Sequence, residues 1–263
     1  AGATTADASF GTLGSPVFGP PIVTTGTVDT DTVGTYTVTY TSTDASGNEG
    51  SATRTVTVVD TTAPEITSSD TFVADENQTA IGTVTATDLQ TVTFTVSGTE
   101  LQITSGGVLT FVTAPDYETK SVYTATVTAT DASSNSTTQD ITVTVTDTND
   151  NSPVLSVSSP YSVAENTTSV GTVTAADADA NSTITFTLRG TDEAKFDINS
   201  ASGGYSVLSA TEFEAPGSEA SSNAYSLNVV ASDGSNTDTE AIVVNVTAVN
   251  DNSPVFTSSA SIS

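Results

Sequence analysis

The sequence predicts an all-β protein built of tandem Greek-key β-sandwiches, and three observations support this prediction. Valine and isoleucine alternate with threonine along many short segments, which is the period of a half-buried strand. Glycine-containing turns, such as those at Gly107 and Gly203, separate these segments. The order of elements then repeats along the 263 residues. The pattern amounts to about seven short strands per hundred residues, as in a Greek-key sandwich.

Internal repetition sets the expected domain organisation. Residues 35–48 recur as residues 122–135 with nine of 14 positions identical, and a second set of matches relates the residues from Pro64 onward to those from Pro153 onward. The third unit keeps this order but has insertions in its middle. We therefore expect one truncated β-domain, two complete ones and the first strand of a fourth, in a piece of a longer protein. The expected boundaries are 1–62, 63–152, 153–254 and 255–263.

Composition excludes several classes of function. The chain has 31 acidic residues against four basic ones, so it cannot form a nucleic-acid-binding surface, and an anionic membrane would repel it. Without cysteine or histidine it has no disulfide, thiolate zinc site, thiol nucleophile or histidine general base. No apolar stretch reaches the roughly 18 residues of a membrane helix, so we expect no membrane insertion. Small metal cations are the natural counter-charge.

The most informative motif is the acidic linker 147–151, which has a close echo at 249–254. Each copy directly follows an alternating strand, so it joins one β-domain to the next. Its oxygen-only ligands indicate calcium, which takes six to eight oxygens at about 2.3–2.6 Å. Two further carboxylates, Asp131 and Asp233, end the inward-facing series of a strand. A carboxylate in that position is costly unless it is paired or bound to a metal.

Units two and three resemble cadherin repeats over about residues 64–254. The motifs behind the resemblance are Ala74-Asp75-Glu76-Asn77, Asp116-Tyr117-Glu118, Asp131, the linker 147–151, Ala164-Glu165-Asn166, Asp177-Ala178-Asp179, Glu212-Phe213-Glu214 and Asp233. Unit one is similar to the immunoglobulin-like repeats of large bacterial adhesins, with markers at 34–36, 43–48 and 60–64. We therefore expect immunoglobulin-like and cadherin-like sandwiches joined by calcium-binding linkers.

The resemblance implies three calcium ions between units two and three. The implied ligands are Glu76, Asp116 and Glu118 of unit two, Asn149, Asp150 and the carbonyls of Thr148 and Asn151 in the linker, and Asp177, Asp179 and Asp233 of unit three. Asp147, which opens the linker, is a further candidate. Among the implied ligands Glu76 and Glu118 would each bridge two ions. Three divalent ions nearly neutralise carboxylates that would otherwise repel one another by about 1–4 kcal/mol per pair at about 4 Å.

Two other places depart from this pattern. Between units one and two the linker is shorter, and Gln90 stands where unit three has Asp179. We expect no three-ion cluster there and at most one ion, held by Asp60, Asp88 and Asp131. The far end of unit three offers at most a partial site, with the candidates Glu165, Glu212, Glu214 and Asp251.

The acidic residues allow two other interpretations. The segment from Asp177 begins like an EF-hand loop, but Ser182 replaces its glycine and Leu188 its final glutamate, so that interpretation fails. Isolated acids such as Asp44 and Asp197 are expected to be turn or cap residues.

The expected function is structural and not enzymatic. We expect a calcium-rigidified extender region of an extracellular adhesin at a bacterial cell surface, holding ligand-binding domains away from the cell. The alternative is a recognition module that binds cell-surface glycans or another cadherin-like domain directly. A third interpretation is an accessory region of a secreted carbohydrate-active enzyme. The full-length gene would separate these, since many further repeats favour the extender and an adjoining catalytic domain favours the enzyme.

Overall fold

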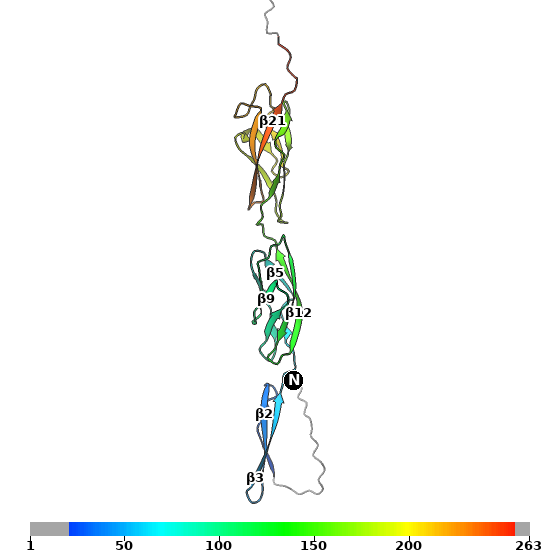
Figure 1. Ribbon diagram of the computed structural model, residues 1–263, viewed down its shortest axis with the longest axis vertical. Helices are drawn as coiled ribbons and strands as arrows, with labels where there is room; N and C mark the ends of the chain where they lie inside the picture. Colours follow the sequence, from blue (N-terminus) through cyan, green and yellow to red (C-terminus); the bar gives the residue numbers. More distant parts are fainter. Residues whose placement is uncertain (1–20, 256–263) are drawn as a thin grey trace, which may run out of the picture. The chain divides into compact units, whose positions relative to one another are not determined.

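The computed structural model describes residues 21–255, which form strands, turns and one short 3-10 helix (Figure 1). The prediction of an all-β fold of tandem sandwiches is confirmed. The expected start of the first domain, residues 1–20, and nearly all of the expected further repeat, 256–263, lie outside the described residues. Within the described part, no helix has the length and apolar character needed to cross a membrane.

The described residues form two compact units, which differ from the three repeat units of the sequence. Unit 1 comprises residues 21–115 and 122–145, and unit 2 comprises residues 116–121 and 146–255. The segment 116–121 therefore belongs with the linker that follows Val145 and not with the strands on either side of it.

Unit 1 begins with a three-stranded sheet in the order β1-β2-β3. Its strands are β1 (Ile22–Thr25), β2 (Gly34–Thr43) and β3 (Glu49–Val58). The two long strands form a hairpin whose turn is fixed by Asp44, because its carboxylate accepts hydrogen bonds from the backbone N–H groups of Ser46 and Asn48. Asp44 is thus a turn residue, as expected.

The rest of unit 1 is a β-sandwich with one sheet in the order β5-β12-β11-β8 and another in the order β6-β10-β9, plus the small pair β4-β7 (Figure 1). Its strands are β4 (Glu65–Ile66), β5 (Thr71–Asp75), β6 (Ala80–Thr83), β7 (Ala86–Thr87), β8 (Thr93–Val96), β9 (Leu101–Ile103), β10 (Val108–Phe111), β11 (Val122–Thr130) and β12 (Ser136–Thr146).

Unit 2 repeats this arrangement, with sheets in the orders β14-β21-β20-β17 and β15-β19-β18 and the pair β13-β16. Its elements are β13 (Val154–Ser156), β14 (Tyr161–Ala164), β15 (Ser169–Thr172), β16 (Thr174–Ala176), β17 (Thr185–Arg189), η1 (Glu193–Lys195), β18 (Phe196–Ile198), β19 (Gly204–Val207), β20 (Ala224–Ser232) and β21 (Thr237–Thr247). Strand β14 pairs parallel to β21, whereas the other pairs of this sheet are antiparallel.

Strand β21 shows how the sequence alternation builds the core. Ile242, Val244 and Val246 are at most 4% exposed, while the residues between them are only partly buried. Tyr225 and Leu227 of β20 lie directly opposite Val244 and Ile242 on the same buried face. Full burial of each such aliphatic side chain contributes about 1.5–3 kcal/mol. The alternation therefore fixes which face of each sheet points inward.

Two equivalent turns require glycine. Gly107 and Gly203 have φ of 89° and 67°, and an added Cβ would lie 2.2 Å from the carbonyl oxygen of Val84 or Val173. In return the N–H groups of Val84 and Val173 donate to the carbonyls of these glycines, at 2.8 and 3.0 Å. Neither turn could accommodate a side chain without moving the neighbouring strand.

Candidate metal-binding sites

The inward-facing carboxylates at the ends of β11 and β20 lie where the alternation placed them. Asp131 is 6% exposed and Asp233 is 9% exposed. Asp131 accepts from the N–H and the side-chain amide of Asn135, both at 2.8 Å. Asp233 accepts from the N–H groups of Asn236 and Ser235, both at 2.6 Å. The N–H of Asn236 is the main cause that holds the pKa of Asp233 below its ordinary value.

Unit 2 brings together two groups of carboxylates that share one residue. Oxygens of Asp177, Asp179 and Asp233 lie within 4.8 Å of one another, and so do oxygens of Glu118, Asp150 and Asp179. Asp179, only 4% exposed, belongs to both groups. We call these five residues the second acidic site. Each close pair of carboxylates costs on the order of 1–4 kcal/mol at about 4 Å, so a counter-charge would stabilise this arrangement.

The linker is fastened directly to this site. Asn151 donates its backbone N–H to Asp179 Oδ2 at 3.0 Å and its side-chain amide to Asp179 Oδ1 at 2.8 Å. The Asn151 carbonyl, an implied calcium ligand, accepts from the Asn236 amide at 2.8 Å and keeps a second lone pair. Asp147 Oδ2 accepts from the N–H of Ala180 at 2.8 Å. These bonds place the linker oxygens beside the carboxylates before any ion binds.

Two buried oxygens, one at the start of the linker and one in the second acidic site, indicate whether a cation fits here. Asp147 Oδ1 and Asp177 Oδ2 are buried, and neither has a hydrogen-bond donor among the described residues. A buried carboxylate oxygen without a partner is rare because its desolvation is not compensated. A cation would supply that compensation.

Asn149 gives a second indication of the same kind. Its amide oxygen faces carboxylates, and the opposite amide orientation would bring nitrogen 3.3 Å from Asp179 Oδ2 and 2.9 Å from Asp233 Oδ2. The amide position thus contacts two carboxylate oxygens. Nitrogen suits that position in the metal-free protein, and oxygen suits it when a cation lies among the three groups. All potential ligands here are oxygens, which is the donor set of calcium.

The remaining implied ligands are placed as follows. Glu76 lies directly after β5 in unit 1 and is 4% exposed. Asp116 is exposed at the start of the segment 116–121 and accepts from the hydroxyl and the N–H of Thr119, at 2.9 and 3.2 Å. The Thr119 hydroxyl is the main cause that lowers the pKa of Asp116. Thr148 is exposed in the linker. The bridging roles of Glu76 and Glu118 stay predictions.

The candidates at the far end of unit 2 form a third acidic site, Glu165, Glu212 and Glu214, with oxygens within 4.8 Å of one another. Glu165 is 1% exposed, and its two oxygens accept from the N–H groups of Phe213 at 2.7 Å and Val249 at 2.6 Å. These two donors, Phe213 first, lower the pKa of Glu165. Backbone donors therefore balance the buried carboxylate here.

Asp251, the fourth candidate at the far end, contacts a neighbouring motif residue. Its Oδ2 accepts from the side-chain amide of Asn166 at 2.6 Å.

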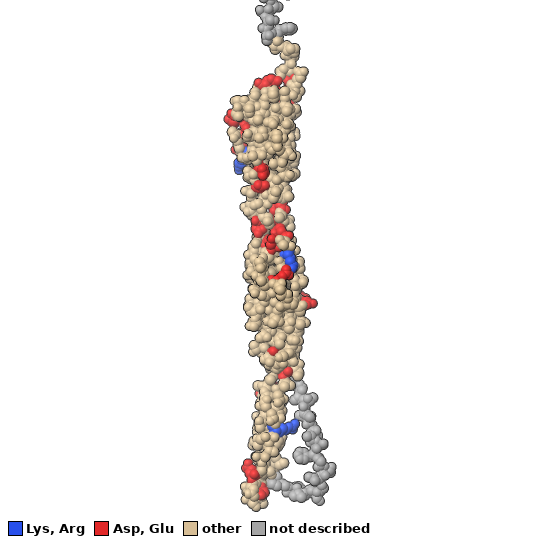
Figure 2. Space-filling model, in the orientation of Figure 1, with Lys and Arg blue, Asp and Glu red and all other residues tan. Residues whose placement is uncertain are grey.

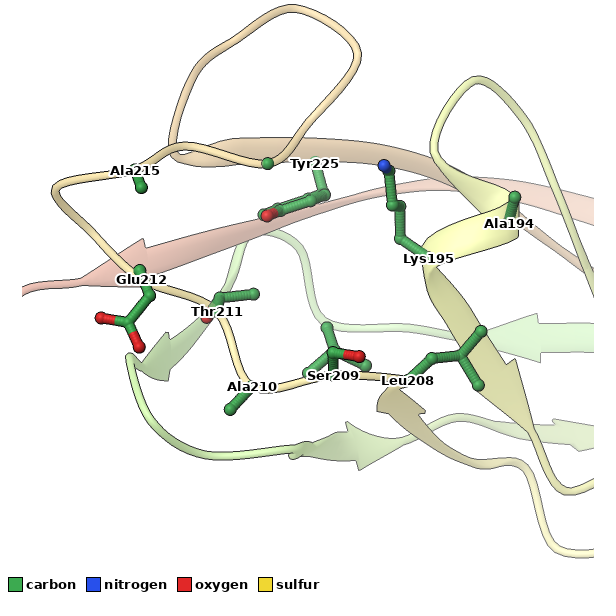
Figure 3. A pocket seen from close by; sticks show the side chains of 11 residues that line it. Ala194, Lys195, Leu208, Ser209, Ala210, Thr211, Glu212, Ala215 and Tyr225 are labelled. Carbon is green, nitrogen blue, oxygen red and sulfur yellow. The ribbon is translucent and has the colours of Figure 1, made fainter.

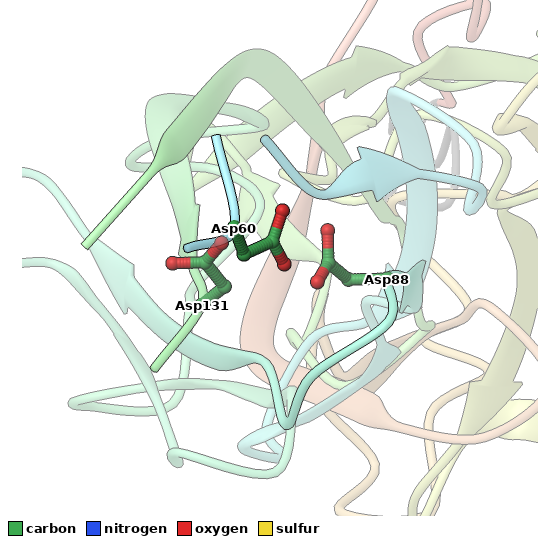
Figure 4. Close-up of side chains that lie close together, drawn as sticks. All are labelled: Asp60, Asp88 and Asp131. Carbon is green, nitrogen blue, oxygen red and sulfur yellow. The ribbon is translucent and has the colours of Figure 1, made fainter. Parts of the chain in front are cut away.

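Unit 1 holds the first acidic site, formed by Asp60, Asp88 and Asp131. One carboxylate oxygen of each lies within 4.8 Å of the others, and Figure 4 shows the three side chains close together. Gln90 lies among them, and its side-chain amide donates to Asp60 Oδ2 at 3.0 Å. The sequence identified Gln90 only as a departure from the Asp-x-Asp pattern. Its role as a donor required the structure, because nothing in the sequence aims its amide at Asp60.

A hollow of about 380 Å³ in unit 2 lies beside η1 and β20 (Figure 3). Its lining contains one carboxylate, Glu212, and one ammonium, Lys195, and both side chains are exposed. Glu212 also belongs to the third acidic site, so this hollow lies beside that group of carboxylates.

Asp197, expected to be a turn or cap residue, is neither. It lies exposed in the middle of β18, opposite Ser206 of β19. The three-residue strand is too short for its alternation to be recognised in the sequence.

Elsewhere the acidic side chains are gathered in patches on the face seen in Figure 2, with few basic side chains among them.

Parts of the chain match two family models. Residues 159–248 match the model described as Cadherin domain, and residues 15–58 match the model described as Bacterial surface protein, Ig-like domain. Over 93 residues the chain is 45% identical to Cadherin EGF LAG seven-pass G-type receptor 2 of Mus musculus and of Homo sapiens. The matched segment is 35% of this chain and only 3% of those receptors.

Solved structures share the fold. The chain is similar to mouse Cadherin-23 EC22-24, with a TM-score of 0.63 and 24% identity over 85% of this chain and 78% of that one. It is also similar to human Protocadherin-24 EC1-2, with a TM-score of 0.62 and 20% identity over 72% of this chain and 99% of that one. These neighbours establish tandem cadherin-like β-sandwiches as the architecture.

Proposed function

We propose that this chain is a calcium-rigidified extender region of an extracellular adhesin, and that calcium bound at the second acidic site stiffens the linker 147–151. The buried, partnerless oxygens of Asp147 and Asp177 are the observation that supports this most directly. The match of residues 159–248 to the cadherin family favours calcium, and the match of residues 15–58 favours a bacterial surface protein.

The physical mechanism follows from the charges. Without a cation the carboxylates of the second acidic site repel one another, and each gains by moving away into water. Calcium accepts six to eight oxygens in a flexible geometry, so it can hold Glu118, Asp150 and Asp179 together although they come from three separate segments. A linker whose residues share an ion with strand ends loses its freedom to bend.

Small-angle scattering tests this proposal on the complete chain. In excess calcium the parent should have a narrow distribution of sizes, and a chelator should broaden it. Asp150→Ala should give the broad profile even with calcium, whereas Asp197→Ala, which removes an exposed carboxylate of β18 outside the acidic sites, should behave as the parent. A calcium-loaded Asp150→Ala profile identical to that of the parent would refute the ligand assignment.

A further inference from the structure

The first acidic site has the same local scaffold as the second. Asp88 Oδ1 accepts from the backbone N–H of Gln90 at 2.8 Å, and Asp177 Oδ1 accepts from the N–H of Asp179 at 3.1 Å. Gln90 and Asp179 therefore occupy equivalent positions of the same turn. One offers an amide donor to its site and the other a carboxylate.

The linkers are also fastened in equivalent ways. The side-chain amide of Asn135 donates to the carbonyl of Asp60 at 3.2 Å, and that of Asn236 donates to the carbonyl of Asn151 at 2.8 Å. Asp60 and Asn151 thus hold equivalent places in the two linkers. The side chains that pair the linker with the turn, however, exchange their chemical types between the two sites.

In the first site this pair has a linker carboxylate and a turn amide, Asp60 and Gln90, at 3.0 Å. In the second site it has a linker amide and a turn carboxylate, Asn151 and Asp179, at 2.8 Å. Because the linker and the turn exchange carboxylate and amide, the turn 88–90 of the first site has only one acid, Asp88.

Gln90 donates one more hydrogen bond, which the carboxylate of Asp179 cannot do because it only accepts. Its amide nitrogen also donates to Ser133 Oγ at 2.6 Å, in the hairpin turn between β11 and β12. The side chain of Gln90 therefore joins the linker at Asp60 to the hairpin turn at Ser133, while its backbone N–H donates to Asp88 in its own turn. No oxygen of Asp60, Asp88 or Asp131 appears among the buried, partnerless atoms of residues 21–255, in contrast to Asp147 and Asp177.

We propose that Gln90 and Asn135 clamp the first acidic site without a metal ion. The two amide nitrogens hold Asp60 by its side chain and its carbonyl, and they supply the positive ends that a cation supplies elsewhere. These hydrogen bonds then hold the segment 60–64 in place with or without calcium. This proposal is independent of calcium at the second site, because every group involved lies in unit 1.

Hydrogen–deuterium exchange on the complete chain tests the clamp, with peptides covering residues 59–64 and 86–92 as the readout. In the parent, exchange of these peptides should be the same in calcium and in chelator. Gln90→Glu keeps the shape of the side chain but places two carboxylates face to face. Its peptides should exchange about tenfold faster or more in chelator, because charge-assisted hydrogen bonds are replaced by repulsion.

The matched control is the double variant Asp60→Asn with Gln90→Glu, which reverses the pair to the order found in the second site. It should restore the slow exchange in chelator. The proposal is overturned if the parent peptides lose their protection in chelator, since an ion would then be holding the junction. It is equally overturned if Gln90→Glu exchanges as slowly as the parent.

Discussion

Asp131 and Asp233 end equivalent strands, are nearly equally buried and are both held by the asparagine of the following turn. What surrounds them differs. Around Asp131 the acidic groups receive hydrogen bonds from Gln90 and Asn135, whereas beside Asp233 a buried oxygen of Asp177 has no donor among the described residues. A buried acid alone is therefore a weak indication of a metal site, and an unmet hydrogen-bonding capacity is a stronger one.

Removal of calcium should give the largest difference between the two sites. Chelation should lower the melting temperature of unit 2 by about 10 °C or more, because each ion bound only by the folded state at a hundred times its dissociation constant contributes about 2.7 kcal/mol. Unit 1 should lose less stability, because its own site is clamped by amides and Glu76 is its only implied calcium ligand. Differential scanning calorimetry with and without chelator measures both transitions, and a melting curve that ignores calcium would remove the basis for the comparison.

The shared position of Asp179 sharpens the comparison within the second site. Asp179→Asn should abolish about two ions, because this carboxylate belongs to both groups, whereas Asp233→Asn should abolish about one. Glu118→Gln should also abolish about two, if it bridges two ions as the resemblance implies. Calorimetric titration of the three variants beside the parent gives the stoichiometry, and equal losses in all of them would contradict shared ligands.

Asp131→Asn in the first site is the matched partner of Asp233→Asn. It should leave the number of bound ions unchanged, but it sets an amide against the Asn135 amide that now donates to Asp131 Oδ2. The expected cost is about 1–3 kcal/mol of unfolding free energy, equal in calcium and in chelator. Denaturant unfolding in both conditions measures it, and a cost that appears only with calcium would indicate an ion in the first site.

The smallest expected effect is the response of the metal-free protein to pH. The N–H of Thr62 and the amide of Gln90 lower the pKa of Asp60 below 3.8, and the N–H of Asn236 lowers that of Asp233. Groups with a lowered pKa stabilise the fold above the unfolded value and lose that contribution as pH falls through the folded one. Stability in chelator should therefore be flat from pH 7 to 5 with respect to these groups and fall below about pH 4. A fall already at pH 6 would require a different titrating group.

Much of the architecture was predictable because β-strand alternation is local. Tyr225, Leu227, Val229 and Ala231 could be assigned to one buried face from their spacing, and the same phase placed Asp233 at its end. Short strands were harder to predict from the sequence. The three residues around Asp197 are too few to show a period, so its place in β18 was missed.

Periodicity and composition specify the all-β class, the repeats, the excess of negative charge and the residues that end each inward-facing strand, because these need no knowledge of distant contacts. Which acids share a site, and which already have donors, depends on the folded arrangement of distant segments. Gln90 and Asp60 are thirty residues apart, and Asp147 and Ala180 thirty-three. Whether a buried carboxylate needs a cation depends on such long-range partners, and the chain brings them together only when it folds.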